Sequence, residues 1–190
     1  MIYLLKALSF FVLGSGVKYI DAAYDDSVFS TAFTVPLALL LGLLAGTCMI
    51  WDHDLLLISL SILVGVLVTG KLDVLPFRLL ALVCLTTTLT YFAGKLPLHG
   101  SDWPILLCFA SGAALDEIGN DLADAGVLRG RLAFFFLNRG FLKVLVAIIV
   151  TVQYLSASFL LLFLAFDFGY FLFTFLSQRR SKLTHRPMGA

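Results

Sequence analysis

Long apolar runs joined by short polar connections make up most of the sequence. Each run approaches the roughly 20 residues that an α-helix needs to cross the hydrocarbon core of a bilayer, and each ends at Gly, Pro or a group of charges. We therefore predict an all-α, polytopic helical bundle with a single transmembrane domain over residues 1–177 and a polar, basic tail at 178–190. The seven predicted spans are residues 2–20, 32–50, 55–70, 75–93, 103–119, 139–156 and 158–177.

Composition excludes a soluble globular domain. Of 190 residues, 61% are hydrophobic and 13% are charged, whereas soluble domains are about half apolar and about a quarter charged. The net charge of +1 argues against a nucleic-acid partner. The first apolar run has the length of a secretion signal, but Lys6 lies inside it and the polar stretch 18–21 follows directly, which favours a retained helix over the alternative of a cleaved peptide.

The positions of the basic residues predict the orientation. With the N-terminus outside and the C-terminus in the cytosol, 11 of the 13 Lys and Arg residues fall on the inner side, and only Lys6 and Lys95 fall outside. Such a bias is typical of membrane insertion. It favours a multi-pass protein of a prokaryotic plasma membrane, with an internal eukaryotic membrane as the alternative.

Acidic residues gather on the same predicted face, and insertion does not explain their position. Eight of the 12 lie there, including Asp26, Asp73 and Glu117. At the end of the first span, Asp21 and Asp25 share a helix face with Lys18, which is suited to a divalent cation that is also bound by substrate phosphates. A solvated interfacial turn is an equally good interpretation.

A second acidic cluster follows the 103–119 span. Asp116, Asn120 and Asp124 fall in one helical row, with Glu117 and Asp121 beside them. Like charges at this density repel one another unless a cation neutralises them, which favours a metal or substrate site over a solvated face.

Basic and buried charged residues complete the predicted site. Asn138, Arg139 and Lys143 are candidates for binding phosphate, and Lys143 lies about one turn inside a span, where a charge is costly unless it is paired or functional. Asp167 lies near the middle of the last span, so it should face the bundle interior and have a partner such as Lys143 or Lys18. For Arg129 and Arg131, anchoring to anionic lipid is the better interpretation.

We expect these residues to serve a membrane-embedded, Mg²⁺- or Mn²⁺-dependent enzyme that acts on a lipid phosphate or diphosphate from the cytosolic side. Asp167 and Lys143 are the catalytic candidates, and Lys18, Arg139 and Asn138 are the phosphate-binding candidates. Metal ligands are expected among Asp21, Asp25, Asp116, Asn120, Asp121 and Asp124.

Two short patterns, Asn120-Asp121-x-x-Asp124 and Asp21-x-x-x-Asp25, are similar to the aspartate-rich motifs of the intramembrane UbiA-type prenyltransferases. The resemblance implies shared metal-dependent chemistry at most, and not membership of that family. The chain departs from that family in the order of the two motifs, in having Leu128 at the position of a further aspartate, and in its shorter length.

Two other classes of function remain open. In a small cation or proton transporter or channel, the same acids would form a cytosolic vestibule and Asp167 a midplane ion site. In an assembly protein, the charged face would dock a partner without metal.

Two further features carry structural expectations. Gly14-Ser-Gly16 predicts close packing between helices. On the outer side, Trp51-Asp52-His53-Asp54 offers too few converging ligands for a metal, and His99 and His185 match no ligand spacing, so zinc chemistry is not expected.

Overall fold

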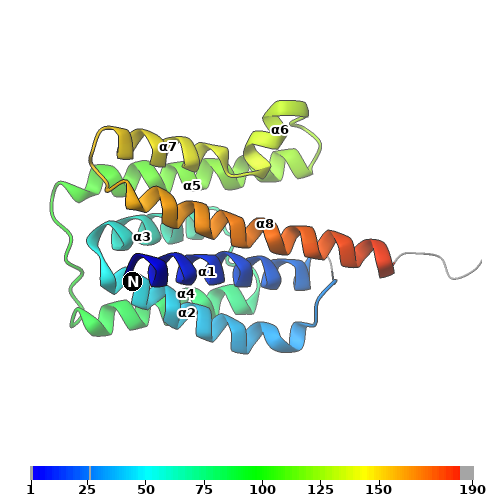
Figure 1. The fold of residues 1–190 in the computed structure, drawn as a ribbon, viewed down its shortest axis with the longest axis horizontal. Coiled ribbons are helices and arrows are strands. Elements are labelled where there is room, and N and C mark those ends of the chain that lie inside the picture. Colours follow the sequence, from blue (N-terminus) through cyan, green and yellow to red (C-terminus); the bar gives the residue numbers. More distant parts are fainter. Residues whose placement is uncertain (1, 26, 185–190) are drawn as a thin grey trace, which may run out of the picture. The chain divides into compact units, whose positions relative to one another are not determined.

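The described parts of the chain, residues 2–25 and 27–184 of a computed structural model, consist of helices and connecting loops (Figure 1). The predicted all-α class is therefore confirmed for these residues. Asp26 and the tail residues 185–190 lie outside the described part. The elements in chain order are α1 Ile2–Tyr24, the 3-10 helix η1 Thr31–Phe33, α2 Thr34–Trp51, α3 His53–Val68, α4 Leu75–Tyr91, α5 Asp102–Asp124, α6 Gly130–Leu137, α7 Gly140–Thr151 and α8 Ser158–Thr184.

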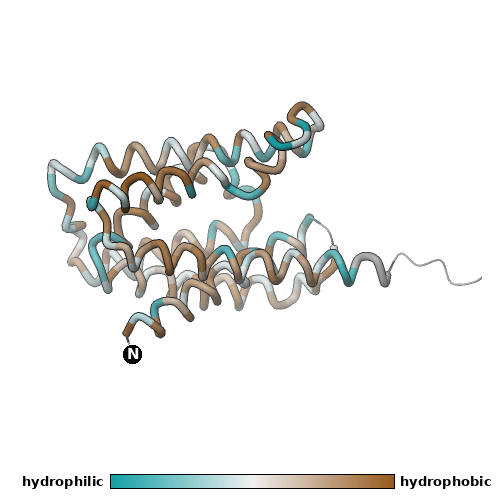
Figure 2. Tube along the Cα trace, turned by 45° about the horizontal axis from the view of Figure 1, so that its top comes forward, coloured by the Kyte–Doolittle hydropathy of each residue, from teal (hydrophilic) through white to brown (hydrophobic). Residues whose placement is uncertain are grey.

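Three stretches among the described residues are long and apolar enough to cross a membrane: Ile2–Tyr24, Thr31–Trp51 and Ser158–Arg180. A fourth is present if α6 and α7 count as one broken span, and α3 and α4 are shorter apolar helices. Figure 2 shows hydrophobic residues along most of the helices and hydrophilic residues mainly at helix ends and in loops. These features are consistent with a helical membrane protein, while the seven-span count and the orientation stay predictions.

The predicted span over 139–156 corresponds to the single helix α7, which is shorter, and α6 precedes it across a break. Helices α6 and α7 meet at an angle of 68°, because Arg139 adopts a left-handed backbone conformation with φ 50° between them. Helix α7 ends at Thr151, shortly before Gln153, which also has a positive φ of 61°. The break at Asn138 and Arg139 coincides with the predicted start of that span, whereas the early end of α7 was not predicted.

The chain forms two compact units, which we describe separately. Unit 1 comprises residues 1–46, 75–87 and 161–190, and unit 2 comprises residues 47–74 and 88–160. The boundaries fall within α2, α4 and α8, so each of these helices contributes residues to both units.

Glycines permit close contact between helices in unit 1. A Cβ added to Gly14 would lie 2.0 Å from the carbonyl oxygen of Phe166 on α8, and one added to Gly16 would lie 2.6 Å from Leu41 on α2. The predicted role of Gly14-Ser-Gly16 in helix packing is thus confirmed. Gly42 and Gly46 of α2, spaced as in a GxxxG motif, likewise contact the backbone of α4.

Unit 2 is built around α5. A Cβ on Gly65 of α3 would lie 2.7 Å from the Ala113 side chain of α5. On α5 itself, a Cβ added to Gly112 would lie 2.3 Å from the Leu145 side chain of α7, and one added to Gly119 would lie 2.1 Å from the Phe136 ring of α6. Helix α5 therefore holds both halves of the broken pair, and α5 and α7 lie side by side (Figure 1).

Candidate functional site

The break between α6 and α7 is held by a buried carboxylate from α5. Asp116 is 2% exposed, and its two carboxylate oxygens accept hydrogen bonds from the backbone N–H groups of Phe141 and Leu142, at 3.0 and 2.7 Å. These donors belong to the first turn of α7, where a helix has N–H groups with no partner inside the helix. Asp116 thus caps the N-terminus of α7 from a neighbouring helix. In most helices this role belongs to the side chain of the residue directly before the first turn.

The next residue on α5 fixes the same junction. Glu117 accepts a hydrogen bond from the Arg139 guanidinium at 3.3 Å, and both side chains are partly buried. A left-handed conformation is costly for a residue with a side chain, so the ion pair helps to hold Arg139 in it. Glu117 thus holds the Arg139 guanidinium at the α6–α7 junction, and Asp116 holds the first turn of α7 there.

The last turns of α5 carry the remaining members of the acidic cluster. Asp121 forms an ion pair with Lys71 of the α3–α4 connection, and its side chain is 55% exposed. The Asn120 amide donates a hydrogen bond to the Asp124 carboxylate at 3.2 Å. The structure thus brings Asp116, Glu117, Asp121 and Arg139 to one end of α5, together with Lys71.

Local sequence explains why Lys71 reaches this end. Gly70 has φ 75° and donates to the Leu67 carbonyl, while the Lys71 N–H donates to the Val66 carbonyl, which is the Schellman pattern that ends a helix. Burial lowers the pKa of Lys71, but its hydrogen bond to Asp121 and the nearby negative charges outweigh this effect, so that the pKa lies above its usual value.

The donor set at this end of α5 suits a hard divalent cation. Asp121, Asp124 and Asn120 present carboxylate and amide oxygens, and Mg²⁺ is typically held by one or two carboxylates while phosphate oxygens and water supply the other ligands. No group of three or more His, Cys, Asp or Glu side chains in the described residues is arranged as a complete metal site.

Asn138 and Lys143 flank the junction in sequence. The Asn138 amide donates to the Phe134 carbonyl at 2.7 Å, within the last turn of α6. Lys143 lies in the first turn of α7, one helical turn after Arg139, and its N–H donates to the Arg139 carbonyl. The phosphate-binding candidate Asn138 and the catalytic candidate Lys143 thus lie within three residues of the N–H groups that Asp116 caps.

The other predicted residues belong to unit 1. Lys18 forms an ion pair with Asp21 on α1, and its ammonium lies 5.3 Å from the ring centroid of Tyr170 on α8. Asp25 follows α1 and is exposed, and Asp167 lies on α8 with intermediate burial. Unit 1 therefore has its own charged cluster, with Lys18 between a carboxylate and an aromatic face.

One polar cluster was missed by the sequence analysis. Asp102 at the start of α5 accepts a hydrogen bond from the His99 backbone at 2.6 Å and lies 3.1 Å from the His53 imidazole, and the two His rings are 5.9 Å apart. The hydrogen bond from His99 lowers the pKa of Asp102, and with the contribution of His53 it outweighs the opposite effect of burial. Helices α3 and α4 separate His53 from His99 in the chain, so no spacing rule in the sequence links the two residues.

Comparison of the chain with protein-family models, with curated proteins and with solved structures gave no match. The functional assignment therefore depends on the residues and contacts described above.

Proposed function

We propose that this protein is a membrane-embedded, divalent-metal-dependent enzyme that acts on a lipid phosphate or diphosphate at the end of α5 in unit 2. The observation that carries the proposal is the meeting of acidic α5 residues with cations from two other segments, Lys71 and Arg139. A metal ion held by carboxylates can bind a phosphate from one side, and an Arg guanidinium can bind the same phosphate from another side.

In this proposal each group has a distinct role. Asp121 and Asp124, with Asn120, hold Mg²⁺ or Mn²⁺, which supplies charge stabilisation to the phosphate and its leaving group when bound. Arg139 and Lys143 bind the phosphate oxygens, and Asn138 orients them.

Asp116 positions Arg139 and Lys143 through its hydrogen bonds to α7. Lys18, Asp21, Asp25 and Asp167 belong to unit 1, and their roles stay predictions.

The proposal is tested by thermal unfolding of the purified protein in detergent with and without Mg²⁺. A ligand that binds the folded state raises its stability with concentration. We expect Mg²⁺ together with a lipid phosphate to raise the unfolding temperature of the wild type, and Asp121→Asn to remove most of that increase.

Asp52→Asn is the matched control. Asp52 caps α3 by accepting the Asp54 N–H at 3.0 Å, and Asn is an equally good capping residue. An equal loss of the metal response in Asp52→Asn and Asp121→Asn, or no metal response in the wild type, contradicts the proposal.

A second function is favoured by one specific observation, the broken α6–α7 pair with buried Asp116 at the break. Broken helices that expose their termini to a polar group are common in transporters. In a cation or proton transporter, Asp116 would be the ion-binding carboxylate. Proton or cation flux into liposomes that depends on Asp116, with no Mg²⁺-dependent turnover of lipid phosphate, would favour this function.

A further inference from the structure

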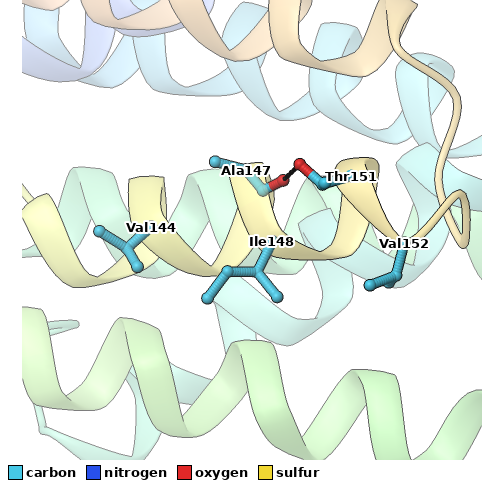
Figure 3. Close-up of a pocket in the computed structure, with 5 residues that line it drawn as sticks. All are labelled: Val144, Ala147, Ile148, Thr151 and Val152. Carbon is cyan, nitrogen blue, oxygen red and sulfur yellow. Dashed lines mark hydrogen bonds between the residues drawn. The ribbon is translucent and has the colours of Figure 1, made fainter.

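One side of α7 carries a shallow, widely open apolar depression of about 300 Å³, here called the groove. Its lining residues all come from this helix: Val144, Ala147, Ile148, Thr151 and Val152. Figure 3 shows Val144, Ile148 and Val152 spaced along one side of the helix. These three side chains are 48%, 52% and 61% exposed, although all are branched and apolar.

The groove offers almost no polar group to a ligand. The Thr151 hydroxyl, the one polar side chain among the five, donates to the Ala147 carbonyl of its own helix at 2.7 Å (Figure 3). The groove surface therefore favours a hydrocarbon. Along the helix axis, Lys143 to Val152 covers about 13 Å, the length of about ten methylene groups in an extended chain.

A positive charge lies at one end of the groove. Lys143 is the residue before Val144 and one turn before Ala147, so it lies at the N-terminal end of the groove and beside its lining residues. Arg139 lies a further turn back, at the α6–α7 junction. An apolar groove that begins at cationic residues is complementary to a lipid with a phosphate headgroup and a hydrocarbon chain.

We propose that this groove binds one hydrocarbon chain of an anionic membrane lipid, with the lipid phosphate at Lys143. This inference rests on the proposed function. It identifies the substrate as a lipid whose chain lies along α7, so that the lipid phosphate is presented to the end of α5. The first ten or so carbons contact the groove, and the remainder of the chain extends past Val152.

The test measures lipid binding in the presence of EDTA, so that it does not depend on a metal. The probes are didecanoyl phosphatidic acid, didecanoylglycerol, which lacks the phosphate, and inorganic phosphate, which lacks the chains. Binding to detergent-solubilised protein is measured by native mass spectrometry and by the shift in unfolding temperature. We expect phosphatidic acid to bind more tightly than either partial ligand.

Two variants separate the chain from the phosphate. Ala147→Phe fills the groove and should lower the affinity for phosphatidic acid and for didecanoylglycerol by about tenfold or more. Lys143→Met should remove the preference for phosphatidic acid over didecanoylglycerol while leaving didecanoylglycerol bound. Leu107→Phe, at an exposed α5 position, and Lys95→Met are the matched controls and should bind as the wild type does.

Wild-type affinity in Ala147→Phe, or an equal loss in Leu107→Phe, overturns the proposal. It is also overturned if inorganic phosphate binds as tightly as phosphatidic acid, because the site would then recognise a free phosphate. A change from dimer to monomer in Ala147→Phe would also overturn the proposal, because a second copy of the chain would then cover α7. Failure of the metal response with lipid binding intact would contradict the proposed enzyme but leave the groove assignment in place.

Discussion

Asp116 shows how a single side chain acquires a structural task that its position in the sequence does not reveal. In the sequence it is one of several acids in a row, whereas in the fold it is buried and accepts two backbone hydrogen bonds from another helix. A buried carboxylate is tolerated when such bonds replace water. Its neighbour Asp121, five residues later, is more than half exposed and pairs with Lys71.

Replacing Asp116 should therefore destabilise the protein more than replacing Asp121. Asp116→Ala leaves the N–H groups of Phe141 and Leu142 without a partner in a buried place, at a cost of about 1–3 kcal/mol. Asp121→Ala removes an exposed ion pair, which is worth about 1 kcal/mol or less. Thermal unfolding in detergent, followed by circular dichroism, measures both, and equal losses would contradict the assigned role of Asp116.

Acid should weaken the contact between Asp102 and its two His partners. Because the pKa of Asp102 is lowered in the folded protein, its contribution to stability is present above the ordinary carboxyl range near pH 4 and is lost as the pH falls through the lower folded value. The unfolding temperature of the wild type should drop more steeply below about pH 4 than that of Asp102→Asn. Parallel curves for the two proteins would exclude this contribution.

At the scale of helices, close approach depends on glycines that face a neighbouring backbone. Gly14 against Phe166, and Gly42 and Gly46 against α4, leave no room for a Cβ. Where lipid competes equally well for apolar side chains, such close packing is a main source of helix association.

Gly14→Ala should consequently destabilise unit 1. The added methyl group would lie 2.0 Å from a backbone oxygen, and overpacking of this kind costs about 1–3 kcal/mol. Gly100→Ala is the control, because no atom lies within 4 Å of a Cβ at that loop position. A lower unfolding temperature for Gly14→Ala alone is expected, and an equal effect of both substitutions would be evidence against α1–α8 contact.

The α6–α7 junction is an element whose geometry depends on Arg139. Arg139→Gly removes the cost of the left-handed conformation but also the ion pair with Glu117, whereas Arg139→Ala removes the pair and keeps the cost. Gly should thus be the better tolerated replacement, by about 1 kcal/mol. Unfolding of the two variants in detergent provides the comparison, and greater stability of Arg139→Ala would indicate another junction conformation.

At the scale of the molecule, the contacts of unit 2 separate the two ends of α5. Lys71, Glu117, Asp121 and Arg139 meet at its C-terminal end, while His53, His99 and Asp102 meet at its start. The predicted topology assigns the first group to the cytosolic side and the second to the outer side. The contacts agree with that grouping, and the choice of which end faces the cytosol is still a prediction.

Cysteine labelling tests this orientation. In a variant whose Cys48, Cys84 and Cys108 are replaced by Ala, Ser101→Cys should react with a membrane-impermeant maleimide added to intact cells. Asp73→Cys, on the α3–α4 connection, should react only after the membrane is permeabilised. Labelling of both positions from the same side would contradict the predicted alternation of spans.

The helical class, the approximate position of most helices and the gathering of acids near residues 116–124 follow from the sequence alone, because apolar runs and local spacing are properties of neighbouring residues. The sequence also predicted tight packing at Gly14-Ser-Gly16. The contacts of those acids, in contrast, depend on how the helices pack. The cap that Asp116 places on α7, the Lys71–Asp121 pair and the grouping of His53 with His99 join residues far apart in the chain. The left-handed conformation of Arg139 is likewise a tertiary feature, since an ion pair with Glu117 of α5 supports it.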